Sequence, residues 1–354
     1  MSSAMVKLGD VINVHYGKAL KADQRVSNGS VHVFGSSGIV GNHDKTLCSY
    51  PTIIIGRKGS VGAITWAPDG GWIIDTAYYV EIKDNNKLDL RYLFYILSGI
   101  DLTKKTITTS IPGLNRDDLY DTFIKLPPFE EQKRIVDLLD KAEGIRQKRE
   151  QAIKLADDFL RATFATMYGN PITNPKKWPV HLMGEIIEFK GGNQPPKSDF
   201  IFEPKQGYIR LVQIRDFKSD KYATYIPQEK AKRIFEVDDV MIARYGPPVF
   251  QILRGLSGSY NVALMKASPK ENIRKGFIFY LLQLPEYHDV VVKNSERTAG
   301  QTGVNLELLN KFNVPLPPIY YQDEILARLT RIEKFKEKIE ISLNHLEMQF
   351  LSLQ

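Results

Sequence analysis

Three residues of the first third of the chain match a short pattern found in metal-dependent nucleases. Pro68-Asp69 followed by Glu81-Ile82-Lys83 would place two carboxylates on Mg²⁺ and a lysine beside the attacking water. A structural interpretation is preferred, because the pattern is short, common by chance and without a counterpart in the second half. Asp69-Gly70-Gly71 is then a turn, and Glu81 and Lys83 are outward residues of a half-buried strand. A nuclease that uses Asp69, Glu81 and Lys83 is therefore kept only as the weaker alternative.

Other residues with catalytic or metal-binding potential lack the spacing that such chemistry needs. Gly246-Pro247-Pro248 resembles the motif of amino-methyltransferases, but a glycine stands where that motif needs a side chain to hold the target amine. The chain has no Gly-x-x-x-x-Gly-Lys phosphate loop, and no two of its six histidines are four residues apart. Cys48 is its single cysteine, which excludes an internal disulfide. We expect no catalytic site, no metal site and no cofactor in this chain.

The charged residues indicate binding rather than catalysis. The 354 residues include 48 Lys and Arg against 41 Asp and Glu, a formal net charge of +7. Residues 130–161 hold equal numbers of both signs and residues 320–354 are slightly acidic, so the basic excess lies elsewhere and favours an anionic partner such as nucleic acid. No apolar run is long enough to cross a membrane and no secretory signal is visible. We therefore expect a cytoplasmic globular protein without membrane contact.

Basic, hydroxyl and amide side chains in Gly-rich segments are candidates for DNA contacts. Phosphates are bound mostly by Lys, Arg, Ser, Thr and backbone amides, and base edges by Arg, Asn and Gln. In the first half the candidates are Lys18, Lys21, Arg25, Ser36, Ser37, Arg57, Lys58, Ser60, Thr108, Thr109 and Ser110. In the second half they are Gln194, Lys197, Arg210, Gln213, Arg215, Arg244, Tyr245, Arg297, Gln301 and Thr302. Base reading is assigned to Gln194, Gln213, Arg215, Arg244 and Gln301, although each candidate also fits a solvated surface or turn residue.

An internal repeat organises the chain. Gly113-Leu114-Asn115 precedes Gly303-Val304-Asn305 by 190 residues, and the pattern Leu-Pro-Pro-x-x-x-Gln at 126–132 recurs at 316–322 at the same distance. Near the start of each half, Leu8-Gly9-Asp10 resembles the residues 175 positions later, Met183-Gly184-Glu185. The ends of the two halves agree while their middles differ in sequence and length, which predicts one frame that carries two different inserts.

Each half is predicted to be a mixed α/β globule followed by one long helix. Short β-like runs separated by Gly, Pro, Asn and Asp indicate globules over residues 1–128 and 180–318, joined through a proline-rich linker at 169–179. Residues 129–168 and 319–354 contain no proline and repeat apolar side chains in steps of three and four, as coiled-coil helices do. We expect these helices to pack on each other; the alternative is that each packs on its own globule. The predicted seam contains Ile135, Leu139, Ile145, Ile153, Phe159, Ile325, Leu329, Ile332, Ile339, Leu343 and Leu346.

This arrangement resembles the DNA-specificity subunit of type I restriction–modification systems. The resemblance covers essentially the whole chain and rests on the repeat, on the Leu-Pro-Pro-x-x-x-Gln pattern before each long helix, and on phrases typical of target-recognition domains. These phrases are GSSGIVG at 35–41, PTIIIGRKGSVG at 51–62, IDTAYYV at 74–80, VMIARYG at 240–246 and YNVAL at 260–264. The resemblance implies an α+β fold, in which two mixed α/β target-recognition domains are related by pseudo-twofold symmetry and joined by an antiparallel coiled coil.

The same resemblance implies a function without catalysis in this chain. Each globule would read one half of an asymmetric split site in double-stranded DNA, and the coiled coil would fix the gap between the half-sites. Two modification subunits would bind S-adenosylmethionine and methylate adenine, and restriction subunits would add ATP- and Mg²⁺-dependent cleavage. Two alternatives stay open: a coiled-coil scaffold or adaptor that binds only protein, and a homodimer that forms when the partner subunits are absent.

Overall fold

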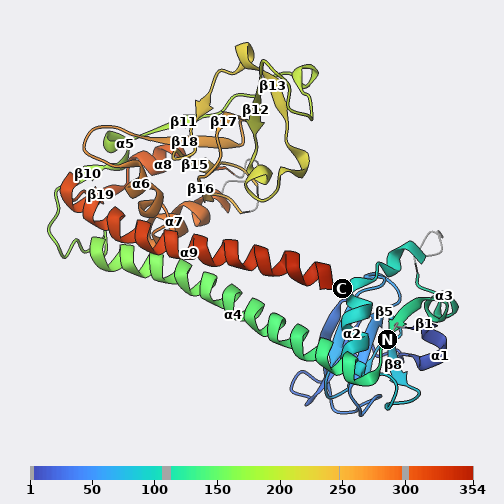
Figure 1. The fold of residues 1–354 in the computed structure, drawn as a ribbon. Helices are drawn as coiled ribbons and strands as arrows, with labels where there is room; N and C mark the ends of the chain where they lie inside the picture. The colour runs from blue at the N-terminus through green and yellow to red at the C-terminus, as the bar shows by residue number, and fades with distance from the viewer. Residues whose placement is uncertain (1–3, 106–112, 247, 297–302, 354) are drawn as a thin grey trace. The chain divides into compact units, whose positions relative to one another are not determined.

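The computed structural model describes residues 4–105, 113–246, 248–296 and 303–353 (Figure 1). The chain divides into two compact units. Unit 1 contains Met1–Gln151 together with Glu340–Gln354, and unit 2 contains Ala152–Ile339. Each unit therefore consists of one globule and a part of both long helices. Within the described ranges, no helix is long and apolar enough to cross a lipid bilayer.

Two sheets and a short ladder build the globule of unit 1. The larger, antiparallel sheet has the order β2-β8-β5-β6, formed by β2 (Ile12–Tyr16), β8 (Ala77–Ile82), β5 (Thr52–Gly56) and β6 (Ile64–Ala67). The second has the order β4-β3-β7, formed by β4 (Gly38–His43), β3 (Val31–Gly35) and β7 (Trp72–Ile73), with β3 parallel to β7. The ladder pairs β1 (Ala4–Lys7) with β9 (Phe123–Leu126). Strand β5 is buried along its whole length, as its uninterrupted apolar sequence predicts.

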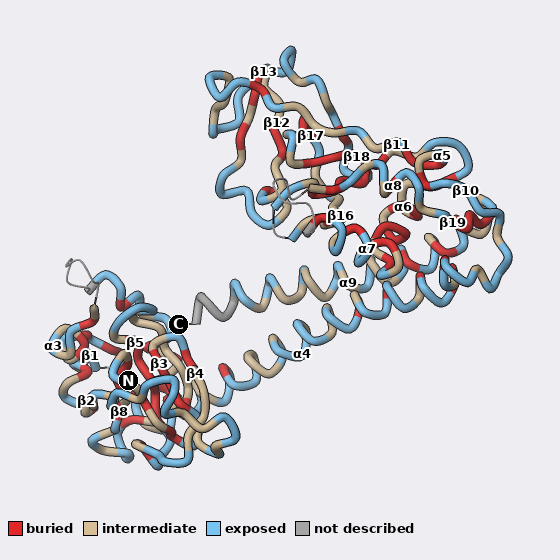
Figure 2. Tube along the Cα trace, turned by 180° about the vertical axis from the view of Figure 1, so that it is seen from behind, coloured by how far each residue is buried: buried red, intermediate tan, exposed pale blue. Residues whose placement is uncertain are grey.

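Three helices accompany these strands in unit 1: α1 (Leu8–Val11), α2 (Leu90–Gly99) and α3 (Arg116–Tyr120). Asp89 and Asn115 start α2 and α3 in the usual way, because each side chain accepts a hydrogen bond from a backbone amide of the first turn. Leu93 of α2 is fully buried in one core with Ile53 and Val80 of the larger sheet. Figure 2 shows that the buried segments concentrate in the strands of each globule.

Unit 2 repeats this plan with different sequences. Its antiparallel sheet has the order β11-β18-β15-β16, formed by β11 (Ile187–Gly191), β18 (Leu264–Pro269), β15 (Val240–Ala243) and β16 (Ile252–Leu253). Its second sheet has the order β13-β12-β17-β14, formed by β13 (Tyr225–Pro227), β12 (Tyr208–Val212), β17 (Gly258–Tyr260) and β14 (Ile234–Phe235), with β12 parallel to β17. A ladder pairs β10 (Val180–Leu182) with β19 (Asn313–Pro315). The helices are α5 (Met183–Ile186), α6 (Lys275–Leu281), α7 (Pro285–Glu296) and α8 (Leu306–Asn310).

The glutamine of the repeated Leu-Pro-Pro-x-x-x-Gln pattern has the same buried position in both units. The Gln132 side chain donates to the carbonyls of Lys87 and Pro127 (2.8 and 2.9 Å) and accepts from the backbone amide of Asp89. Gln322 makes the equivalent three bonds, to the carbonyls of Asn272 and Pro317 and from the amide of Arg274. Each glutamine thus ties the start of a long helix to the segment that opens a helix of its own globule.

The two long helices are α4 (Phe129–Tyr168) and α9 (Ile319–Leu353), and they run antiparallel. In unit 1 the Arg149 guanidinium donates to the carbonyl of Ser342, and in unit 2 the Lys336 ammonium donates to the Asp157 carboxylate, both at 2.7 Å. The later residue on α4 therefore meets the earlier residue on α9. This confirms the predicted pairing of two helices of opposite direction.

The predicted seam residues differ in their burial. Leu139, Ile325 and Leu329 are buried, whereas Ile145 and Phe159 are 43% and 59% exposed. The half-buried members are Ile135, Ile153, Ile332, Ile339, Leu343 and Leu346. Next to Ile145, Arg146 is half-buried and bonds to Glu143 of the same helix, so a charged side chain is less exposed here than its apolar neighbour.

The ends of the long helices also pack on globules, which was the alternative interpretation. Ile325 and Leu329 of α9 lie in the core of unit 2, together with Phe164 and Tyr168 from the end of α4. Ile135 of α4 packs on the core of unit 1. Each long helix therefore packs on a globule near its start, and the end of α4 also packs in the core of unit 2.

Candidate nucleic-acid interface

Three segments that carry predicted DNA contacts meet at residues 73–76 of unit 1, here called the central segment of unit 1. The amide of Lys18 donates to the carbonyl of Ile73 (2.8 Å), and the amide of Arg57 donates to the carbonyl of Thr76 (2.9 Å). The amide of Ile74 donates to the carbonyl of Phe34, directly before the turn that contains Ser36 and Ser37. Lys18, the serine turn and Arg57-Lys58 are thereby brought together, although they lie far apart in the sequence.

The same backbone bonds form around residues 260–263, the central segment of unit 2. The amide of Asn193 donates to the carbonyl of Tyr260 (3.1 Å), and the amide of Arg244 donates to the carbonyl of Ala263 (2.8 Å). The amide of Asn261 donates to the carbonyl of Val212 (3.2 Å). The residues that follow these contacts, Gln194, Gln213 and Tyr245, are thus placed around one segment.

Aromatic rings position the Arg57 side chain in unit 1. Its guanidinium carbon lies 5.1 Å from the ring centre of Tyr16 and 5.8 Å from that of Tyr78, and Nη1 donates to the carbonyl of Asp75 (3.1 Å). Burial, together with the hydrogen bond to Tyr16, raises the pKa of Tyr78 to about 12. The Tyr78 ring therefore stays uncharged near neutral pH, and the face of such a ring attracts a guanidinium without neutralising its charge.

Two members of this cluster, Tyr16 and Arg116, were missed in the sequence analysis. The Arg116 guanidinium carbon lies 5.3 Å from the Tyr16 ring centre, so Tyr16 contacts both Arg57 and Arg116. Arg116 directly follows the repeated Gly113-Leu114-Asn115 signature, at a position where the second half has Leu306. A departure from the repeat directly beside the repeated Gly-x-Asn signature is the sequence signal that could have identified Arg116.

In unit 2 the cluster is rich in amides. The side-chain amide of Gln213 lies 3.4 Å from the Thr224 hydroxyl, and its backbone amide donates to the Asp216 carboxylate (2.8 Å). Burial raises the pKa of Asp216. Gln194 is exposed, and the Arg244 guanidinium lies 5.0 Å from the ring centre of Tyr245. Unit 2 thus offers glutamines near Arg244 and Arg215, whereas unit 1 offers lysines, serines and arginines.

Other predicted contacts lie elsewhere or have internal partners. Arg25 donates to the carbonyls of Val40 and Leu20, and Arg210 pairs with Asp220 at 2.7 Å. The Arg215 guanidinium lies 5.4 Å from the ring centre of Tyr222 and donates to the Tyr222 carbonyl (3.5 Å). The exposed residues outside the bonds described above are Lys21, Ser60 and Lys197. Outside the described residues lie Thr108, Thr109, Ser110, Arg297, Gln301 and Thr302.

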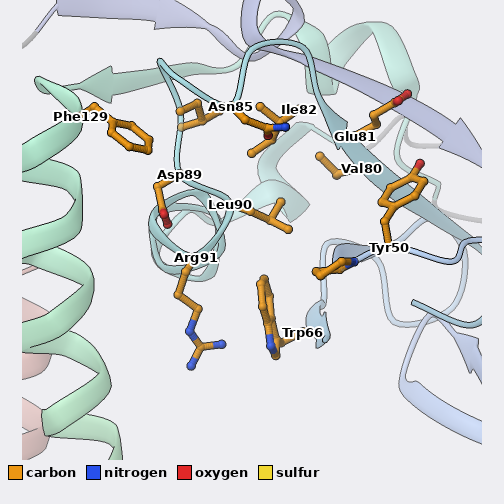
Figure 3. A pocket seen from close by; sticks show the side chains of 12 residues that line it. Tyr50, Trp66, Val80, Glu81, Ile82, Asn85, Asp89, Leu90, Arg91 and Phe129 are labelled. Carbon is orange, nitrogen blue, oxygen red and sulfur yellow. The ribbon is translucent and has the colours of Figure 1, made fainter. Parts of the chain in front are cut away.

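The residues of the nuclease pattern have local partners. Glu81 Oε2 lies 2.9 Å from His15 Nε2, Lys83 donates to the carbonyl of Gly9, and Asp69 is exposed. Glu81 also lines a hollow of about 590 Å³ in unit 1, where the other carboxylate, Asp89, caps α2 (Figure 3). In the part of the chain that the structure describes, no group of three His, Cys, Asp or Glu could hold a metal ion.

Comparison with known proteins identifies the family. The model of the type I restriction modification DNA specificity domain matches residues 2–155 and again residues 175–347. The chain belongs to this family. Its members are non-catalytic specificity subunits of type I restriction–modification systems, so the nuclease alternative is not retained.

Individual relatives agree with this assignment. The specificity subunit of the type I restriction enzyme EcoBI from Escherichia coli is 22% identical over 336 residues, covering 84% of this chain and 70% of that protein. The specificity subunit of the type I restriction enzyme MjaVIII from Methanocaldococcus jannaschii is 21% identical over 305 residues, covering 74% of this chain and 69% of that protein.

Solved structures share the fold. The S subunit of a type I restriction–modification system from M. genitalium superposes with a TM-score of 0.63 at 16% identity, covering 99% of this chain and 94% of that one. A chain from a structure described as showing complex assembly and conformational transition of the type I R-M system gives a TM-score of 0.59 at 19% identity, with coverages of 99% and 96%.

Proposed function

We propose that this specificity subunit reads a bipartite, asymmetric site in double-stranded DNA, one half-site with each globule. The observation that carries the proposal is that both units build the same central segment with the same backbone bonds but surround it with different side chains. Lysines, serines and arginines gather in unit 1, and glutamines gather in unit 2. Since base edges are distinguished by the side chains offered to them, two different sets read two different half-sites.

The antiparallel helix pair is proposed to set the gap between the half-sites. Half-sites on one face of B-DNA recur about every 34 Å. A helix of 35 residues, the length of α9, is about 52 Å long at 1.5 Å per residue. A spacer of that length is long enough to separate two readers by one turn of DNA.

Partner subunits are proposed to supply the chemistry. Two modification subunits would bring S-adenosylmethionine, and restriction subunits docked through them would bring ATP and Mg²⁺. The exposed apolar side chains of Leu155 and Phe159 on α4 and Phe335 on α9 support a docking surface on the long helices, because large exposed apolar groups often mark protein interfaces. We place the assembled complex in the cytoplasm, where its DNA substrate lies.

The test is to express this chain with the neighbouring genes of its host and to sequence the methylated bases of the recipient genome. We expect one motif of two unlike half-sites separated by a fixed number of unspecified base pairs, and co-purification of the chain with the modification subunits. A strain that carries the partner genes without this chain is the control. Absence of a motif, together with no binding of duplex DNA by the complex, would instead favour a scaffold that binds only protein.

A further inference from the structure

Arg57 and Arg244 occupy the same position in the two units. Each directly follows the buried strand that pairs on both sides within the antiparallel sheet of its unit, β5 in unit 1 and β15 in unit 2. Each backbone amide donates to the central segment of its unit. Each backbone carbonyl accepts from the residue after the repeated glycine, Leu114 in unit 1 (3.0 Å) and Val304 in unit 2 (3.1 Å).

The residues around these two arginines differ between the units. The residue after Arg57 is Lys58, and the residue after Arg244 is Tyr245. The last residue of the first sheet strand is Tyr16 in β2 but Gly191 in β11, where a Cβ atom would lie 2.9 Å from Arg244 Nη1. An arginine is therefore kept at a position whose neighbours have diverged.

Both guanidinium groups keep their charge available. Each lies over a tyrosine ring, and within the described ranges neither forms a salt bridge with a carboxylate. The structural arginines of the same globules are different, because Arg91 pairs with Asp140 and Arg254 pairs with Glu333. Arg57 and Arg244 are also only half-buried, so an anion can reach their donors.

We infer that Arg57 and Arg244 bind equivalent backbone phosphates of the two half-sites and position each globule on the duplex, whereas the diverged neighbours read bases. This assignment rests on the proposed function. Two readers of different sequences can share a contact residue when its ligand is common to both sequences, and the phosphate backbone is such a ligand. For Arg244 the assignment replaces the base-reading role predicted from the sequence.

The test measures DNA affinity of the full complex as a function of salt for Arg57→Ala, Arg244→Ala and the double variant. One duplex carries the site found by methylation mapping, and a second duplex carries scrambled half-sites. We expect each single variant to weaken binding to both duplexes by the same factor and to reduce the slope of log K against log salt by about 0.9, with the double variant showing the sum. Arg57→Lys and Arg244→Lys should keep the wild-type slope, since lysine also binds phosphate.

Arg134→Ala is the matched control, because Arg134 is an exposed arginine on α4 and should leave the slope unchanged. An unchanged slope in both alanine variants, or weakening confined to the duplex with the true site, would overturn the assignment while leaving the proposed function intact. A changed methylation motif in either variant would overturn it as well. Failure of the wild-type complex to bind either duplex would overturn the proposed function and this assignment together.

Discussion

At the scale of single residues, the buried glutamines Gln132 and Gln322 explain why a short pattern recurs. Each side chain satisfies two carbonyls and one amide that the surrounding apolar core hides from water. A glutamine offers two donors and an acceptor in one plane, which an aliphatic residue of similar size cannot replace. The glutamine therefore fixes the position at which the long helix leaves its globule.

Replacing Gln132 by alanine should destabilise unit 1 by about 2 to 4 kcal/mol, because three buried backbone groups lose their partners. Hydrogen exchange followed by mass spectrometry should show faster exchange in α2 and at the start of α4. Gln151→Ala is the control, since Gln151 is an exposed glutamine of the same helix. Equal exchange in the two variants would contradict this account.

The sequence identified this glutamine but not its function, and it missed the tyrosine beside the arginine. Repetition is visible in one dimension, so Gln132 and Gln322 were found by their spacing. Burial and stacking cannot be seen in the sequence. Tyr16 looks like any aromatic residue of a strand there, and only the structure shows its contacts with Arg57 and Arg116. Most predicted DNA contacts were chosen by residue type alone, so the ion pair of Arg210 with Asp220 could not be taken into account.

At the scale of elements, burial alternates sharply along α4. Leu139 is 2% exposed while its neighbour Leu138 is 53% exposed. The heptad pattern selected Leu139, which is buried, but it also selected Ile145 and Phe159, which are exposed. Alanines broaden the apolar stripe of α4, so several registers fit its sequence, and the partial burial of the charged Arg146 could not be anticipated from its polarity.

Truncating the buried leucine should therefore affect the element far more than truncating the exposed one. Leu139→Ala should cost about 2 to 5 kcal/mol, because it leaves a cavity in place of a buried side chain. Leu138→Ala should change stability by no more than about 0.5 kcal/mol. Urea unfolding monitored by circular dichroism gives both free energies of unfolding. Equal losses of stability in the two variants would show that α4 does not bury Leu139 in preference to Leu138.

At the scale of the whole molecule, the internal repeat predicted two copies of one fold. The repeat is visible because a few positions accept only one residue type. A Cβ atom on Gly17 would lie 2.1 Å from the carbonyl oxygen of Ile74, and one on Gly192 would lie 1.9 Å from that of Asn261. Only glycine fits such an approach, so both positions keep it. The order of the strands was not predictable, since the inserts between these fixed points share neither length nor sequence.

If the helix pair acts as a ruler, lengthening both helices should lengthen the gap in the recognised site. Seven residues inserted between Arg149 and Asp157 of α4, and seven between Lys336 and Ser342 of α9, preserve the heptad register and add about 10 Å. At 3.4 Å per base pair this corresponds to roughly three additional unspecified base pairs, which methylation mapping would detect.

An insertion in α4 alone is the matched control for this experiment. It shifts one helix against the other, so the Arg149–Ser342 and Asp157–Lys336 contacts can no longer both form. We expect that variant to lose sequence-specific methylation, because mismatched helices no longer hold the two globules at one defined distance. If the complex with both insertions methylates the original motif with its original gap, the gap does not depend on the length of the helices and must be set by other contacts.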